Sequence, residues 1–245
     1  MGVSRSGSGR AVILVLTAVA GGAALTALAP VVDAAAQAGS IAGRATTAVP
    51  APTAAIRVTA NPEVCGQTVP DESIVVDAEG GLANAVVTVV GLTAPAEAPP
   101  IEVSNEGCLF RPRVQVSRPG GAIDLTSVDN VLHTSHAYAE DGRSLFNIAI
   151  PMAGLTIRRQ LTARGLVRLA CDTHTWMRGF IMASVDRTAV SEADGSFRLD
   201  GVPPGTYELR FWHEVLEGTS QTVTVPAAGV ADVLVDFRSA AGAEP

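Results

Sequence analysis

Lysine is absent from this chain, because all 17 basic residues among its 245 residues are arginine. Without a lysine amine, catalysis through a Schiff base is excluded. No Gly-x-Ser-x-Gly nucleophile motif and no phosphate-binding loop follow residue 38, which argues against those hydrolase and nucleotide-binding classes. Acids outnumber bases, giving a net charge of -7, and an acidic chain is a poor partner for nucleic acid.

Helical spacing of apolar residues is also missing beyond residue 38. Apolar residues instead alternate with polar ones, which is typical of strands with one buried face. The alternating sets are Val114 and Val116; Ile123 and Leu125; Val167, Leu169 and Cys171; Phe197 and Leu199; Tyr207, Leu209 and Phe211; and Val233, Val235 and Phe237. We therefore predict an all-β chain built from β-sandwiches.

The first 38 residues have the layout of a secretory signal peptide. Arg5 and Arg10 precede an uncharged stretch at 11–32, and Ala36-Gln37-Ala38 offers a small-x-small cleavage site. The layout predicts export to the periplasm or the cell surface. Retention as a membrane anchor is the alternative, because an uncharged stretch of this length can span a bilayer.

The three cysteines are Cys65, Cys108 and Cys171. Disulfides persist outside the cytoplasm, and an odd number leaves one thiol unpaired. The simplest pairing joins Cys65 to Cys108 and keeps Cys171 free for a metal. A pairing that used Cys171 would remove the metal ligand described next.

Cys171, His174 and Met177 place a thiol, an imidazole and a thioether within seven residues. Thiolate and thioether suit Cu(I), imidazole suits both oxidation states, and a His₂Cys plane with a weak axial Met is the geometry of electron-transfer copper sites. His133 or His136 would supply the second imidazole. These lie three residues apart, on opposite faces of an extended segment, so one of them is expected to reach the metal.

The run at 171–181, Cys-Asp-Thr-His-Thr-Trp-Met-Arg-Gly-Phe-Ile, resembles the ligand loop of amicyanin- and plastocyanin-like cupredoxins, which reads Cys-x₂-His-x₂-Met and then Arg-Gly in the amicyanin form. The upstream ligand of that family is the first His of a His-Asn-Val-His-like stretch, which corresponds to His133. The similarity extends over about residues 100–187. It implies a Greek-key cupredoxin β-sandwich that holds one type 1 copper through His133, Cys171, His174 and Met177.

The resemblance also implies that His174 lies in an exposed loop, with its edge ringed by Trp176 and Met152 as the electron portal. Two features depart from the family pattern. Thr173 and Thr175 stand where that loop carries prolines, and Thr134 replaces an Asn that normally stiffens the site through hydrogen bonds. His213 lies in another segment and is expected to be structural.

Residues 189–212 resemble the second half of a carboxypeptidase regulatory-like domain, a transthyretin-like β-sandwich. The likeness rests on the Asp194-Gly195 turn and on Pro203-Pro204-Gly205 before a Tyr-bearing strand. Residues 77–90 resemble the first half of that domain. The cupredoxin is therefore either inserted into this smaller sandwich or joined to it in tandem, and the sandwich acts as a scaffold or as a docking module.

The predicted organisation follows from these motifs. A stretch rich in Ala, Thr and Pro at 42–60 and an Ala- and Pro-rich stretch at 94–100 are expected to be linkers or loops. The segments are a signal peptide (1–38), a linker with the first part of the regulatory-like sandwich (39–94), the copper domain (95–188) and the second part of that sandwich (189–240).

The predicted function is a type 1 copper protein, not an enzyme, that carries single electrons between transient extracytoplasmic protein partners. The alternatives are an envelope structural or binding module with an incidental metal site, and a zinc hydrolase using His, His and Cys. A multicopper oxidase would need paired His-x-His motifs, which this sequence lacks.

Overall fold

A computed structural model describes residues 38–239 of the chain. Nearly all of its regular structure is β-strand, and the strands form several hydrogen-bonded sheets. Within this range no helix combines the length and the apolar character needed to cross a membrane. The predicted signal peptide lies almost wholly outside the described residues. The predicted all-β class and sandwich architecture are confirmed.

The larger sandwich, which we call the first sandwich, consists of two sheets. One sheet has the order β10-β9-β12-β13-β7 and the other has the order β11-β8-β5-β6. Their bounds are β5 (Ile101–Glu106), β6 (Leu109–Arg111), β7 (Val114–Ser117), β8 (Gly121–Ser127), β9 (His133–Ala139), β10 (Ser144–Ile150), β11 (Thr156–Leu161), β12 (Gly165–Ala170) and β13 (Arg178–Ala183). Non-consecutive strands such as β9 and β12 are neighbours, so the sheets are not simple meanders.

Period-two alternation explains how these strands build a core. Ile123 and Leu125 of β8 and Val167 and Leu169 of β12 all point inward and are buried in one apolar cluster. Burying a side chain of this size contributes about 1.5–3 kcal/mol. Cys171 continues the inward phase of β12 into the same cluster, so the strand pattern delivers the thiol to the interior.

The second sandwich consists of the sheets β15-β1-β18 and β14-β4-β16-β17 around a separate apolar cluster. Its strands are β1 (Gly39–Thr47), β4 (Val86–Thr93), β14 (Asp186–Val190), β15 (Ser196–Val202), β16 (Gly205–Trp212), β17 (Thr219–Val225) and β18 (Val230–Phe237). In β18 the burial pattern alternates strictly, with Val233, Val235 and Phe237 facing the core.

The chain leaves the second sandwich after β4 and re-enters it at β14, because these two strands pair with each other. Thr93 lies opposite Asp186, so the two ends of the intervening segment meet. The predicted boundary between 188 and 189 falls inside β14. Residues 39–47, within or next to the predicted 42–60 linker, form β1.

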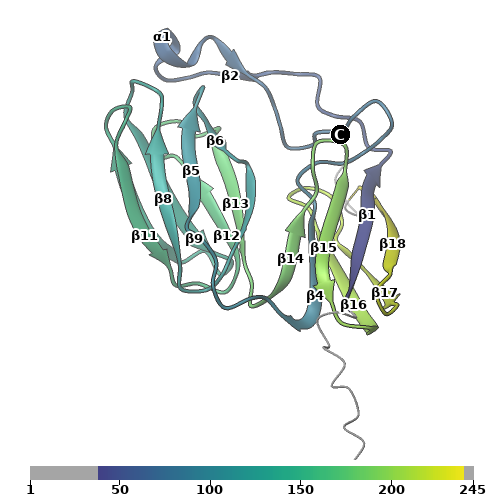
Figure 1. The fold of residues 1–245 in the computed structure, drawn as a ribbon. Coiled ribbons are helices and arrows are strands. Elements are labelled where there is room, and N and C mark those ends of the chain that lie inside the picture. Colours follow the sequence, from purple (N-terminus) through teal and green to yellow (C-terminus); the bar gives the residue numbers. More distant parts are fainter. Residues whose placement is uncertain (1–37, 240–245) are drawn as a thin grey trace, which may run out of the picture. The chain divides into compact units, whose positions relative to one another are not determined.

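Three short elements lie near one end of the first sandwich, namely β2 (Ile56–Arg57), α1 (Pro62–Cys65) and β3 (Thr68–Val69). Figure 1 shows α1 beyond the ends of β5, β8 and β11. Val58, Cys65 and Val69 are buried in the core cluster of the first sandwich. This segment therefore packs with the domain predicted to bind copper, although it precedes that domain in the chain and lies in the range predicted to be linker and regulatory-like sandwich.

Candidate metal centre

Three of the predicted ligands come from the turn between β12 and β13. These strands pair up to Ala170 opposite Arg178, so residues 171–177 form a tight connection at the sheet end. The N–H of Met177 donates to the carbonyl of His174 at 2.9 Å, which folds the loop back on itself. A straight strand would point Cys171 and His174 to opposite faces. The folded loop points both inward, and both are buried.

His133 reaches the same place from β9. It is the first residue of that strand, and β9 lies beside β12 with His136 opposite Ala170. The N–H of Thr134 donates to the sulfur of Cys171 at 3.3 Å, so the start of β9 is joined to the loop directly. His133 is fully buried.

The ligand atoms of His133, Cys171 and His174 converge. They all lie within 4.8 Å of one another, with 3.0 Å between the two Nδ1 atoms and 3.6 Å between the Cys171 sulfur and Nδ1 of His174. Metal–nitrogen bonds of about 2.0 Å and metal–sulfur bonds of about 2.3 Å allow such atoms to share one ion. The spacing therefore fits a single metal.

The outward-facing ring nitrogens determine which atoms are free to bind that metal. Nε2 of His133 lies 3.0 Å from Oδ2 of Asp129, and Nε2 of His174 lies 3.2 Å from Oδ1 of Asn61. Both partners are acceptors, since the Asn61 amide nitrogen donates to Glu63, so each Nε2 carries the proton. The two Nδ1 atoms then present lone pairs to each other and to the sulfur, an arrangement that a cation would stabilise.

The ionisation of these groups suits a metal as well. Burial raises the pKa of the Cys171 thiol, but the contact with the His133 side chain, the N–H groups of Thr134 and His174 and the Thr134 hydroxyl outweigh it, so the pKa is lowered overall. Burial, together with the nearby His133, lowers the pKa of His174 to about 4 against a weaker opposing effect of Asp129. The thiolate and the neutral imidazole are the forms that bind metals, and both pKa shifts favour them.

Thr134 supplies the connection expected from the Asn that it replaces. Its hydroxyl accepts from the N–H of Asp172 at 2.7 Å and lies 3.7 Å from the Cys171 sulfur. The side chain therefore links β9 both to the thiol and to the backbone of the residue that follows it.

Met177 and Trp176 complete the loop. Met177 is fully buried in the same core cluster as Cys171. Trp176 is also buried, and its indole N–H donates to the carbonyl of Cys108 at 3.0 Å. The predicted axial ligand thus lies in the interior, in the same loop as Cys171 and His174.

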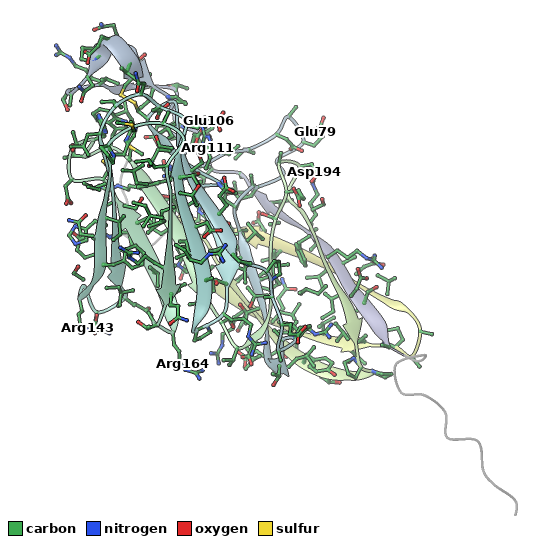
Figure 2. The ribbon with its side chains drawn as sticks, turned by 60° about the vertical axis from the view of Figure 1, so that its left-hand side comes forward. Glu79, Glu106, Arg111, Arg143, Arg164 and Asp194 are labelled. Carbon is green, nitrogen blue, oxygen red and sulfur yellow. A yellow bond between two sulfur atoms is a disulfide. The ribbon has the colours of Figure 1, made fainter. Side chains whose placement is uncertain are left out.

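The disulfide predicted between Cys65 and Cys108 is present. A cysteine sulfur of this bond and a ring nitrogen of His174 belong to one group whose atoms lie within 4.8 Å. Figure 2 shows sulfur atoms in yellow below α1, whereas the labelled Arg143 and Arg164 lie toward the opposite end of the sandwich. The disulfide therefore borders the candidate metal site.

The expectation that His174 lies in an exposed loop is wrong. Its side chain is 0% exposed, because Asn61 and the disulfide-linked segment around α1 cover it. Met152 is half exposed in the loop after β10. The predicted electron portal requires an edge of the His174 ring that faces solvent, and in the structure this ring is buried.

The remaining histidines lie outside the cluster. The ring of His136 contacts Asp172 at 3.0 Å and Ser144 at 2.9 Å on the outer side of β9. His213 is buried in the second sandwich, with its ring 6.0 Å from that of Phe237. Neither belongs to a group of potential ligands within residues 38–239.

Asn61 and Asp129 were not identified as site residues from the sequence. Asp129 precedes His133 by only four residues, and this closeness in the chain could have suggested it as a hydrogen-bond partner of the His133 ring. Asn61 is 113 positions from His174, and only the Cys65–Cys108 pairing hints that its segment lies near the site.

No protein-family model and no curated protein match this chain. Among solved structures, a purple cupredoxin from Nitrosopumilus maritimus is 18% identical and matches 34% of this chain and 99% of its own, with a TM-score of 0.31. A reduced amicyanin carrying a single substitution is 16% identical and matches 40% of this chain and 98% of its own, with a TM-score of 0.32.

A copper-containing nitrite reductase from Thermus scotoductus is 23% identical over 39% of this chain and 25% of its own, with a TM-score of 0.29. These three matches are two cupredoxins and one copper enzyme, each aligned at a low TM-score with less than half of this chain.

Proposed function

We propose that this protein is a type 1 copper protein that carries single electrons. The observation that supports this most directly is the convergence of the Cys171 sulfur with Nδ1 of His133 and Nδ1 of His174, three atoms on buried side chains that lie within 4.8 Å of one another. His133, Cys171 and His174 would hold the metal in a plane, with Met177 as a weak axial ligand. Bound copper supplies one-electron chemistry between Cu(I) and Cu(II).

The protein's own part in that chemistry is to hold the ligands still and to exclude water. Asp129 and Asn61 fix the two imidazole rings, and Thr134 fixes the thiol. Hydrogen bonds to the outer sides of the ligands maintain their orientation and tune the metal. Rings held in this way need little movement when the charge at the site changes.

The closed geometry favours electron transfer over catalysis. All four proposed ligand side chains are buried, and four donors leave no position for a substrate. A hydrolytic zinc site would keep such a position open, and a thioether would add nothing to it.

We further propose an extracytoplasmic location, which the Cys65–Cys108 disulfide supports, because such bonds persist in oxidising compartments. The redox partners would dock transiently through a small interface. The second sandwich would serve as the scaffold that carries the copper domain.

The test is visible absorption and electron paramagnetic resonance of the purified protein after addition of Cu(II), beside Cys171→Ser and His136→Ala. We expect an intense thiolate charge-transfer band and small copper hyperfine splitting in the wild type and in His136→Ala, and neither signal in Cys171→Ser. A wild-type protein that stays colourless, or that gives ordinary Cu(II) signals, would overturn the proposal and favour a zinc site or an incidental one.

A further inference from the structure

The segment that covers His174 is the feature of this chain that the proposed function does not explain. Electron exchange through an imidazole edge would be fastest if that edge met solvent or a partner, yet Asn61 occupies the position beyond Nε2. Both disulfide sulfurs lie within 4.8 Å of a ring nitrogen of His174. The cover therefore blocks the most direct approach to a proposed copper ligand.

We propose that residues 58–69 form a clamped cover over the copper site, so that copper enters and leaves through the His174 side only when this cover lifts. The inference rests on the proposed function, since it assumes that His174 is a copper ligand. Asn61 acts in it as a positioning residue that orients the His174 ring, and Cys65–Cys108 acts as the clamp.

The cover has little secondary structure of its own. Helix α1 has four residues, and β3 pairs only two residues with β2, the short strand just before the cover. Elements this short are not stable on their own. The hydrogen bonds of Val58 to Gln67 and of Cys65 to Asn61 are internal to the segment and do not hold it to the sandwich.

Attachment to the sandwich comes from a few contacts. Val58, Cys65 and Val69 bury their side chains in the core cluster, and Asn61 bonds His174. Cys65–Cys108 is the covalent link, and Cys108 is itself held by the Trp176 indole and by Asp129. With so few contacts the cover is a candidate for local opening without global unfolding, and the disulfide sets the cost of that opening.

Accessibility of the His174 ring can be measured without copper. The metal-free full-length protein is treated with diethyl pyrocarbonate, and modification of each histidine is followed by mass spectrometry. His136, which is partly exposed and bonded to Asp172 and Ser144 away from the cover, is the internal reference. The variants are Cys65→Ser with Cys108→Ser, Asn61→Ala, and Gln67→Ala as a control at an exposed position of the same segment.

We expect His174 to react at least about tenfold more slowly than His136 in the wild type and in Gln67→Ala, as protection by a closed segment requires. Without the disulfide, His174 should react about tenfold faster or more, and Asn61→Ala should give a smaller increase with the disulfide intact. Equal reactivity of His174 and His136 in the wild type would overturn the proposal. So would unchanged His174 reactivity in both the cysteine and the Asn61 variants.

A second measurement follows copper itself. Removal of copper by excess chelator, monitored by loss of the charge-transfer band, should be about tenfold faster without the disulfide. Unchanged removal, with His174 more reactive, would show that copper leaves by another route and would overturn the proposal. If no variant binds copper, the proposed function fails, whereas the modification experiment still shows whether residues 58–69 cover His174.

Discussion

Nε2 of His133 lies 3.0 Å from Oδ2 of Asp129, the residue four positions earlier in the chain. The same carboxylate accepts the N–H groups of Gly107 and Cys108 at 2.8 Å each. One side chain therefore holds a proposed copper ligand and the turn that carries the disulfide. The geometry of the candidate metal site and the attachment of the segment beside it depend on a common residue.

Replacing Asp129 should affect both stability and copper binding. Asp129→Ala leaves the Cys108 N–H without its partner, at a cost of about 1–3 kcal/mol. It also releases the His133 ring, and loss of such an orienting group lowers metal affinity about 10–100-fold. Chemical denaturation and competition with a copper chelator measure the two effects.

Asp124→Ala is the control for this experiment, because Asp124 pairs with Arg158 on the surface of the same sandwich. An exposed pair of this kind contributes about 0–1 kcal/mol, and copper affinity should not change. Wild-type copper affinity in Asp129→Ala would show that the carboxylate does not position His133.

Thr134 should influence the reduction potential through its hydroxyl. Thr134→Val keeps the size of the side chain but removes the O–H that lies 3.7 Å from the Cys171 sulfur. With one donor fewer, the thiolate is more electron-rich and stabilises Cu(II), so the potential should fall. Spectroelectrochemical titration measures this, and Thr134→Ser, which retains the hydroxyl, should stay near the wild-type value. A potential that is unchanged in Thr134→Val would exclude this role.

Removing the disulfide should destabilise the protein measurably. Cys65 and Cys108 are 43 residues apart, and closing a loop of that length is worth about 4 kcal/mol in the chain-entropy description. Cys65→Ser combined with Cys108→Ser should therefore lower the denaturation midpoint. A midpoint equal to that of the wild type would mean that the segment remains ordered in the unfolded chain or adds nothing to stability.

Stability should also depend on pH through His213. Burial, followed by the charge of Arg113, lowers the pKa of this histidine to about 4 from 6.5. Between these values the unfolded chain binds more protons than the folded one, so the free energy of unfolding rises with pH over this interval, by up to about 3 kcal/mol. The gain is lost as the pH falls toward 4.

The matched variant is His213→Gln, which is polar but does not titrate in this range. Denaturation of both proteins between pH 4 and 6.5 should show a shallower slope for the variant. His174 titrates in both and cancels in the comparison. Identical slopes would mean that His213 is not buried in its neutral form.

The parts of the structure that the sequence predicts well depend on local pattern. Alternation in β8, β12 and β18 identifies the buried faces, because period two is a property of the strand itself. The meeting of Cys171 and His174 in the 171–177 loop follows from spacing, since side chains only three residues apart need nothing more than a tight turn to meet.

The parts that could not be predicted depend on contacts between distant residues. β1 reads as a small-residue linker, yet it lies between β15 and β18, where a Cβ at Gly43 would lie 2.2 Å from the carbonyl of Val233. Small residues are required there because the neighbouring strands lie so close to β1. The local sequence of β1 does not reveal those neighbours. Likewise Asn61 reaches His174 because its segment packs on the end of the first sandwich and is joined to it by a disulfide.

The pairing of β4 with β14 and of β1 with β18 has a consequence for the order in which the chain can fold. All strands of the first sandwich and of its covering segment lie before residue 184, whereas β1 pairs with β18 at residues 230–237. Pairings distant in sequence form slowly. His133, Cys171 and His174 can thus come together while the framework into which their sandwich is inserted is still an incomplete set of strands.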